Sequence, residues 1–386
     1  MHKVMFIPEF GDYGGVFDYF DALLNYYISN NYEIVLVLNK NQILKIIDSG
    51  IYSKIEKNHQ IKICEVNNKS NIELKLNNKF IFSLIFDLKK YFKIFNIEKP
   101  DLLVISTGSP GSLLSLILLN IKFIYICHSY PNNGNKYSLK NIILNIFLSR
   151  KKRILTVSYF AKKNFVKFWN LNKKSDFINV VYNTVFKKEF SKDDILGVKE
   201  KIQDSHYKNI LTLGHMRWYK NPEAWLEVAK IIALKDKSIR FIWAGDGELY
   251  NDFIKKIKLS KIENANLLGF INDIDFLYKK SVIYFQPSLI ENHSLSILNA
   301  MKHGIPCIVS KIGGSPESVI DGETGFVIDV ENHEEMAEKL ILLIKNKNLR
   351  EKMGLASKNR FEEKFSYKAW LDKMDLLHNT VLKIKF

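Results

Sequence analysis

Cysteines are few in this chain, and a leader sequence and a membrane span are both missing from its pattern. Three cysteines, Cys64, Cys127 and Cys307, are odd in number, far apart and set in or beside apolar runs. This pattern predicts buried thiols in a reducing compartment rather than a disulfide framework. The N-terminal run KVMFIPEF passes directly into a glycine turn, so we expect no signal peptide. The longest charge-free stretch, residues 102–121, contains TGSPGS, which predicts strand, turn and helix instead of a membrane span.

Motifs for metals, dinucleotides and nucleic acids are also missing. No His/Cys cluster has zinc spacing, and no Ser/His/Asp set can be paired from the sequence. The first glycine turn is not GxGxxG, and aromatic–basic recognition motifs are absent. DID at 273–275 has the DxD pattern of metal sites, but it opens a predicted helix, which favours capping. We therefore expect no metal site, no resident cofactor and no nucleic-acid partner.

The charge is present but uneven. The chain has 57 Lys and Arg and 41 Asp and Glu. Residues 1–190 hold 27 of the basic and 14 of the acidic residues, and residues 191–386 hold the other 30 and 27. A basic first half predicts that one lobe meets something anionic. Residues 140–153 join an apolar helix to four consecutive cations, and residues 80–95 carry an aromatic face with lysines. These features predict a cytoplasmic protein held peripherally at the anionic inner face of the cytoplasmic membrane. Core helices with solvated charges are the alternative.

Short apolar runs alternate with helical spacing along the whole chain. Continuous apolar strands between helices indicate parallel sheets covered on both faces. The pattern stops in a polar segment near residue 188 and restarts at 209. We therefore predict an α/β protein with two doubly wound, Rossmann-like lobes facing across a cleft. The expected parts are a first lobe at 1–187 that binds the acceptor, a linker at 188–208, a second lobe at 209–365 and a C-terminal helix at 366–386.

Three glycine turns follow predicted strands, where ligands of such sheets bind. They are GDYGG at 11–15, GDGE at 245–248 and GGSPE at 313–317. Gly14, Gly15 and Gly245 would let the backbone approach a phosphate or a sugar. Each turn taken singly is equally consistent with a tight connection.

Longer motifs then point to a family. In the second half they are GHMRWYKN (214–221), WAGDGE (243–248), NLLGF (266–270), QPSLIENHSLSILNAMKHGIPCIVS (286–310) and KIGGSPESVIDGETGFVID (311–329). This half resembles the retaining nucleotide-sugar glycosyltransferases of family four, which have the GT-B fold. The first half matches more loosely, through the Gly14–Gly15 turn, HSYP (128–131), TVSYFAKK (156–163) and VVYNTVF (180–186). The resemblance implies that the C-terminal helix crosses back to the first lobe.

The resemblance also implies a site for the donor diphosphate. Lys220 aligns with the phosphate-binding lysine of the family. Where the family has an arginine this chain has His215, and Arg217 lies two residues on. We expect Arg217 to take that role, because a guanidinium binds phosphate oxygens at any pH; His215 as a neutral strand-end residue is the alternative.

The stretch ENHSLSILN at 291–299 supplies the rest of the expected donor site. Glu291 matches the glutamate that binds the donor sugar, while Asn299 stands where the family has a second glutamate on the ribose. An amide can still donate and accept hydrogen bonds. The free N–H groups of a helix that begins at Ser294, Leu295 and Ser296 would hold the diphosphate.

His128 ends an apolar strand of the first lobe, near where the family has a histidine that touches the transferred sugar. We assign it a catalytic role, with a satisfied core histidine as the alternative. The expected activity is metal-independent, retaining transfer of a sugar from a UDP- or GDP-sugar to a cell-surface glycan, on a lipid-linked acceptor of lipopolysaccharide, O-antigen or capsule type, with an α-linkage. A nucleotide-sugar epimerase or hydrolase, or a weakly catalytic subunit of another transferase, stays open. The oligomeric state cannot be read from the sequence.

Overall fold

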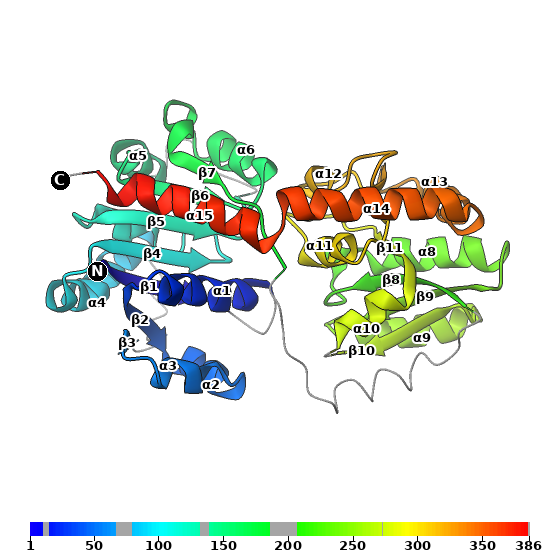
Figure 1. Cartoon of the computed structure of the whole chain (residues 1–386), viewed down its shortest axis with the longest axis horizontal. Coiled ribbons are helices and arrows are strands. Elements are labelled where there is room, and N and C mark those ends of the chain that lie inside the picture. Colours follow the sequence, from blue (N-terminus) through cyan, green and yellow to red (C-terminus); the bar gives the residue numbers. More distant parts are fainter. Residues whose placement is uncertain (11–14, 67–78, 132–138, 186–206, 272, 385–386) are drawn as a thin grey trace. The chain divides into compact units, whose positions relative to one another are not determined.

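A computed structural model describes residues 1–10, 15–66, 79–131, 139–185, 207–271 and 273–384 (Figure 1). The chain divides into two compact units: Met1–Val181 with Leu371–Phe386 (unit 1), and Tyr182–Trp370 (unit 2). Unit 1 thus ends its first segment at Val181, ahead of the boundary predicted at 187. The predicted linker at 188–208 lies outside the described residues except for its last two.

Unit 1 is built on a seven-stranded sheet in the order β3-β2-β1-β4-β5-β6-β7. All of these neighbours pair in parallel. The central strands are buried on both faces, which explains their unbroken runs of apolar residues. The elements of unit 1 are β1 (Lys3–Glu9), α1 (Gly15–Ser29), β2 (Glu33–Asn39), α2 (Lys40–Asp48), α3 (Ile51–Glu56), β3 (Ile61–Val66), α4 (Lys79–Glu98), β4 (Leu102–Thr107), η1 (Leu114–Leu118), β5 (Lys122–Cys127), α5 (Leu139–Phe147), β6 (Lys152–Thr156), α6 (Tyr159–Phe168), η2 (Asn172–Phe177), β7 (Ile178–Val180) and most of α15 (Tyr367–Leu382).

Unit 2 has a second parallel sheet, of six strands in the order β10-β9-β8-β11-β12-β13. Its core includes the buried indoles of Trp225 and Trp243, which meet edge to face at 5.6 Å between ring centroids. The predicted fold class, two doubly wound parallel sheets, is confirmed. The elements of unit 2 are β8 (Lys208–Leu213), η3 (Trp218–Lys220), α8 (Pro222–Ala233), β9 (Ile239–Ala244), α9 (Tyr250–Ser260), β10 (Ala265–Gly269), α10 (Ile274–Lys279), β11 (Ser281–Gln286), α11 (Leu295–Lys302), β12 (Cys307–Ser310), α12 (Ser315–Ser318), β13 (Gly325–Ile328), α13 (His333–Lys345) and α14 (Lys347–Lys364).

The C-terminal helix α15 returns to unit 1, as predicted (Figure 1). It packs on α1 through two polar contacts among buried aromatic rings. Tyr26 donates its hydroxyl to Asp375 Oδ1 at 2.9 Å, and the Tyr27 hydroxyl lies 3.0 Å from His378 Nε2. Burial lowers the pKa of His378 to about 4, so this ring is neutral near neutral pH.

The three cysteines are free thiols, as the sequence predicts, and Cys127 and Cys307 are buried. Burial raises the pKa of Cys127 to about 12, which makes this thiol unreactive. Within the described part of the chain, no helix has the length and apolarity needed to cross a bilayer.

The run of four cations at 150–153 is less exposed than its sequence suggests. Lys152 Nζ donates to the carbonyl oxygens of Ile117 and Leu119 at 2.5 and 2.6 Å. Its burial lowers its pKa to about 8. Arg153 Nη1 donates to Asn179 Oδ1 at 3.2 Å. Two of these four side chains therefore hold the start of β6, and the membrane contact predicted for residues 140–153 stays a prediction.

Candidate functional site

The predicted donor-site residues of unit 2 gather at one edge of its sheet. Strands β9, β8 and β11 are neighbours and run parallel, so the segments that follow them leave from the same edge. These segments carry Gly245 after β9, His215, Arg217 and Lys220 after β8, and Glu291, Ser294, Leu295 and Ser296 after β11. A backbone bond from Leu289 N to Tyr219 O, at 2.8 Å, ties the last two segments together.

Glycines allow these segments to pack closely. Gly245 has φ +134°, and a Cβ added there would lie 2.2 Å from Gly214 O. A Cβ on Gly313, with φ +61°, would lie 1.7 Å from Glu291 O. The second and third glycine turns therefore serve backbone packing. The GGSPE turn also braces the loop that carries Glu291, since Gly314 N donates to Glu291 O at 3.1 Å.

Lys220 and Glu291 form a salt bridge that the two motifs did not predict. Lys220 Nζ lies 2.6 Å from Glu291 Oε2, and the two side chains are only 16% and 12% exposed. Gln286 Nε2 donates to the same oxygen at 2.7 Å. The amide of Gln286 is oriented in turn, because its Oε1 accepts from Tyr284 and Ser294 at 2.8 and 3.1 Å. Within the described residues, both bonds to the carboxylate fall on Oε2, which leaves Oε1 available for a ligand.

Helix α11 begins where it was predicted to begin. Ser294 is its N-cap and accepts from Ile297 N at 3.5 Å. Leu295 and Ser296 form the first turn, whose N–H groups have no acceptor within the helix itself. Further along, Asn299 is 8% exposed, and its Nδ2 donates to Leu295 O at 3.2 Å. The Asn299 amide thus uses one of its two N–H donors within the helix and keeps its oxygen as an acceptor.

His215 and Arg217 differ in their surroundings. His215 Nδ1 lies 3.3 Å from Asp246 Oδ1, and both side chains are about half exposed. The Arg217 side chain is exposed and has no hydrogen bond or ion pair with any described residue. Of the two, Arg217 is the one with an uncommitted charge.

His293, two residues after Glu291, was missed by the sequence analysis. Its ring is 4% exposed and stacks on Tyr182 at 4.8 Å between centroids, with Phe365 at 5.3 Å. Neither ring nitrogen has a hydrogen-bond partner in the described structure. Burial and the nearby charge of Arg360 lower the pKa of His293 to about 3. The residue therefore packs as a neutral aromatic ring, and Asn183 Nδ2 donates to its carbonyl oxygen at 2.9 Å.

Unit 1 places its own candidates at the carboxyl edge of its sheet. His128 directly follows β5; its Nε2 lies 2.9 Å from Ser106 Oγ, and its ring meets Tyr19 edge to face at 4.5 Å. Burial lowers the pKa of His128 to about 4, so it is neutral near pH 7. Gly15 is the first residue of α1, whereas Gly14 lies outside the described residues.

A second residue at this edge, Glu9, was also missed. Glu9 ends β1, and its Oε1 accepts from Ser112 Oγ at 2.7 Å. Its Oε2 is buried without a partner among the described residues. A buried carboxylate oxygen without a donor is costly, which makes it a candidate to bind a ligand hydroxyl. The only sequence signal was a charged residue at the end of an apolar strand.

The DID segment has no metal-site geometry. Asp273 is 6% exposed and caps α10, accepting from Phe276 N at 3.2 Å. Asp275 pairs with His303 at 3.6 Å. The predicted capping role is confirmed for Asp273. Within the described residues, no group of three or more His, Cys, Asp or Glu could hold a metal ion.

Comparison with known proteins gives a consistent result. Residues 198–360 match the family described as Glycosyl transferases group 1. The chain is similar to the capsular polysaccharide biosynthesis glycosyltransferase CapM of Staphylococcus aureus, with 23% identity over 78% of this chain and 83% of that protein. It is also similar to a UDP-Gal:alpha-D-GlcNAc-diphosphoundecaprenol alpha-1,3-galactosyltransferase of Escherichia coli, with 27% identity over 72% of this chain and 74% of that protein. A glycosyltransferase structure from Rickettsia africae superposes with a TM-score of 0.79 and 19% identity, over 100% of this chain and 99% of that one.

Proposed function

We propose that this chain moves a sugar from a UDP- or GDP-sugar to a growing cell-surface glycan. The chain is a glycosyltransferase with the GT-B fold, and its residues 198–360 match the glycosyl transferases group 1 family. The acceptor is lipid-linked and the new bond is an α-linkage formed with retention. Two bacterial relatives support this substrate class, since one is a capsular polysaccharide biosynthesis glycosyltransferase and the other a galactosyltransferase that acts on a diphosphoundecaprenol-linked sugar. The observation that carries the proposal is the Lys220–Glu291–Gln286 network beside the N-terminus of α11.

The leaving diphosphate gains negative charge as the glycosidic bond breaks. Lys220, Arg217 and the first-turn N–H groups of α11 are the groups in unit 2 that can stabilise this charge without a metal. Arg217 has no competing carboxylate in the described structure, so its guanidinium can bind phosphate oxygens in bidentate fashion. His215 stays with Asp246 and shapes the turn after β8.

Glu291 holds the donor sugar in this proposal. Its Oε2 is fixed by Lys220 and Gln286, and its Oε1 accepts a hydroxyl of the transferred sugar. A carboxylate held in this way orients the sugar ring as positive charge develops at the anomeric carbon. In unit 1, His128 is neutral and can hydrogen-bond to a sugar hydroxyl, the role that the family resemblance implies for it. Asn299 accepts a ribose hydroxyl through its amide oxygen.

The proposal is tested with the purified full chain and a panel of UDP- and GDP-sugars. A thermal shift identifies the nucleotide sugar that binds, and transfer to lipid-linked acceptors identifies the activity. The anomeric configuration of the product, measured by NMR, reports retention. Release of free sugar and nucleotide at the same rate with and without acceptor would show a hydrolase instead. Thermal shifts with no turnover on any acceptor would indicate a weakly catalytic subunit.

A further inference from the structure

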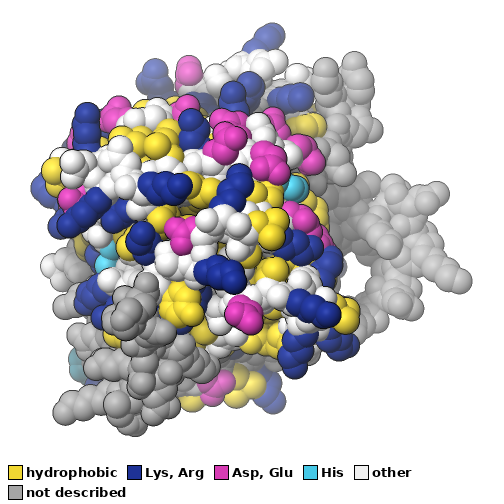
Figure 2. Space-filling view, turned by 90° about the vertical axis from the view of Figure 1, so that its right-hand side faces the viewer, with side chains coloured by type: hydrophobic (Ala, Val, Ile, Leu, Met, Phe, Trp, Pro, Cys, Tyr) yellow, Lys and Arg dark blue, Asp and Glu magenta, His cyan; other side chains and the backbone are white. Residues whose placement is uncertain are grey.

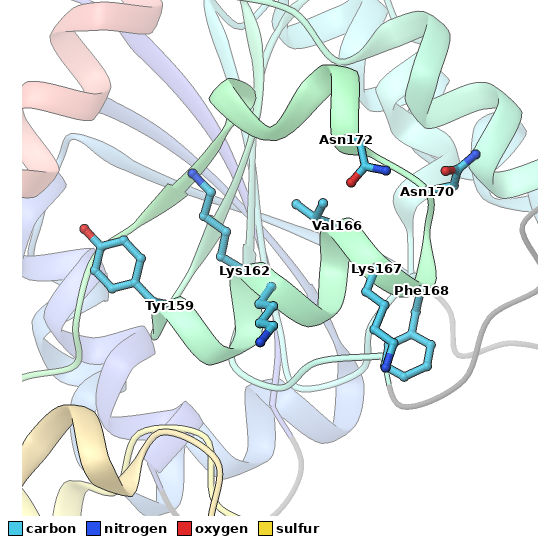
Figure 3. A pocket seen from close by; sticks show the side chains of 8 residues that line it. Tyr159, Lys162, Val166, Lys167, Phe168, Asn170 and Asn172 are labelled. Carbon is cyan, nitrogen blue, oxygen red and sulfur yellow. The ribbon is translucent and has the colours of Figure 1, made fainter.

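The exposed face of α6 is rich in lysine. Tyr159, Lys162, Lys163, Val166 and Lys167 recur at i, i+3, i+4, i+7 and i+8, so they share one face of the helix. Figure 3 shows Tyr159, Lys162, Val166 and Lys167 along α6, with Asn170 and Asn172 on the segment that follows it. The opposite face is buried in unit 1, and this one faces solvent.

An open pocket of about 910 Å³ lies on this face. Its lining combines the apolar side chains of Val166 and Phe168 with three lysine ammonium groups. Lys167 Nζ lies 5.1 Å from the centroid of the Phe168 ring. The pocket therefore matches a ligand that has an anionic group next to an apolar part.

The lysines of this face have no acidic partner. Neither Lys162, Lys163 nor Lys167 forms a salt bridge with any carboxylate in the described part of the chain. The sequence explains why: residues 102–175 contain twelve Lys and Arg and no Asp or Glu. In unit 2, by contrast, several surface lysines pair with carboxylates, as Lys256 does with Glu223 at 2.5 Å. The face drawn in Figure 2 mixes cations with anions in the same way. The positive charge on α6 is thus left for an external anion.

Helix α5 adds exposed apolar side chains beside this pocket. Ile142 and Ile146, one turn apart on α5, are 51% and 65% exposed. Asn145 Nδ2, from the same helix, donates at 3.1 Å to the carbonyl oxygen of Asn170, which lines the pocket. The two isoleucines and the three lysines are therefore parts of one surface, called here the α5–α6 face.

We infer that the α5–α6 face docks the protein on a membrane surface that carries anionic phospholipid headgroups. Lys162, Lys163 and Lys167 bind the phosphates, while Ile142 and Ile146 enter the boundary between headgroups and acyl chains. The inference rests on the proposed function, in which the acceptor is lipid-linked. It places the membrane contact on α6 and not on the basic run at 150–153, because Lys152 and Arg153 of that run bind oxygen atoms within unit 1.

The test is flotation of the full chain with phosphatidylcholine vesicles, prepared with and without phosphatidylglycerol, at low and high salt. The wild type should float only with the anionic vesicles and should be released by salt. The triple variant Lys162→Gln/Lys163→Gln/Lys167→Gln should lose roughly a hundredfold in partition coefficient, since each cation near an anionic leaflet contributes several-fold. Ile142→Ser/Ile146→Ser should weaken binding to the anionic vesicles at low salt, although it leaves the lysines unchanged, because it removes the apolar contact with the acyl-chain boundary.

A matched control removes the same charge from unit 2. Lys255→Gln/Lys258→Gln/Lys261→Gln, on and just after α9, should change the partition coefficient by less than about twofold, because these lysines belong to unit 2 and are not part of the α5–α6 face. Equal losses in both triple variants would overturn the inference, because net charge alone would then explain binding. Binding of soluble pyrophosphate at α6 without vesicle binding would also overturn it, as would a dimer that the α6 variant dissociates. The flotation assay contains no nucleotide sugar, so it measures membrane binding alone. The hydrolysis and transfer assays test the proposed function separately, and failure of one test therefore does not imply failure of the other.

Discussion

The salt bridge between Lys220 and Glu291 leads to the sharpest prediction. Each residue has a role toward the donor, yet the two are 2.6 Å apart and only 16% and 12% exposed. Removing either one leaves the other partly buried without its partner, so the effects of the single changes should overlap. We expect Lys220→Ala and Glu291→Ala each to lower kcat/KM by roughly a hundredfold or more, the loss of about 2.7–4 kcal/mol of charge stabilisation in the transition state.

The double variant measures the overlap. A hydrogen bond to a charged group contributes about 1.5–3 kcal/mol, so Lys220→Ala/Glu291→Ala should lose about 10- to 150-fold less than the product of the two single losses. The assay is steady-state kinetics of the four proteins with one donor and saturating acceptor. Thermal unfolding of each variant separates activity from stability. Losses that multiply to within about 0.5 kcal/mol would refute the reasoning, because the two groups would then act independently in the working enzyme.

Three further predictions concern Asn299, His293 and Glu9. Asn299→Ala should raise the donor KM several-fold and leave kcat nearly intact. A neutral hydrogen bond remote from the breaking bond contributes about 0.5–1.5 kcal/mol to the ground state and the transition state alike. An equal loss in kcat would show that the ribose role is misassigned. His293→Phe should keep activity and reduce the loss of stability below pH 6.5. In the unfolded chain His293 takes up a proton near pH 6.5, whereas the folded ring, with its pKa of about 3, stays neutral. His293 therefore lowers the free energy of unfolding by about 1.4 kcal/mol per pH unit below pH 6.5, and the Phe variant should lack this contribution. Chemical denaturation at pH 7 and pH 5 checks this, and an unchanged slope would count against a buried neutral ring. Glu9→Gln should raise the acceptor KM several-fold and leave the donor KM unchanged, since Glu9 belongs to unit 1; a change confined to the donor KM would contradict its assignment to the acceptor.

Much of the fold could be predicted because burial in a parallel sheet leaves a direct trace in the sequence. Each apolar run that was predicted to be a strand overlaps a strand of the structure, from β1 at Lys3–Glu9 to β13 at Gly325–Ile328. A strand covered on both faces tolerates few polar side chains, so its limits are visible without knowing its neighbours. The same reasoning placed Lys220 and Glu291 at one edge of the sheet. Lys220 follows β8, and Glu291 follows β11, which pairs with β8 in parallel.

Side-chain partners could not be predicted in this way. Lys220 and Glu291 are 71 positions apart in the chain, and nothing in either motif says that their charged groups touch. Lys152 stands in a run of four cations that suggests solvated charges, yet its ammonium group is bound to two carbonyl oxygens of the segment after β4. His293 has a polar side chain in a polar loop, and only its packing between Tyr182 and Phe365 shows that it is neutral.

The sequence by itself determined the order and type of the elements, the glycine-rich turns after the strands and the motifs of the donor site, because these depend on local periodicity and spacing. The tertiary structure alone decided which charges are committed and which are free. The side chains of Arg217 and the lysines of α6 have no hydrogen-bond or ion-pair partner in the described part of the chain, whereas those of Lys152, Lys220 and His215 do. Whether a charge is free depends on what the fold brings within about 4 Å of it, and two residues that meet at that distance can lie anywhere in the sequence.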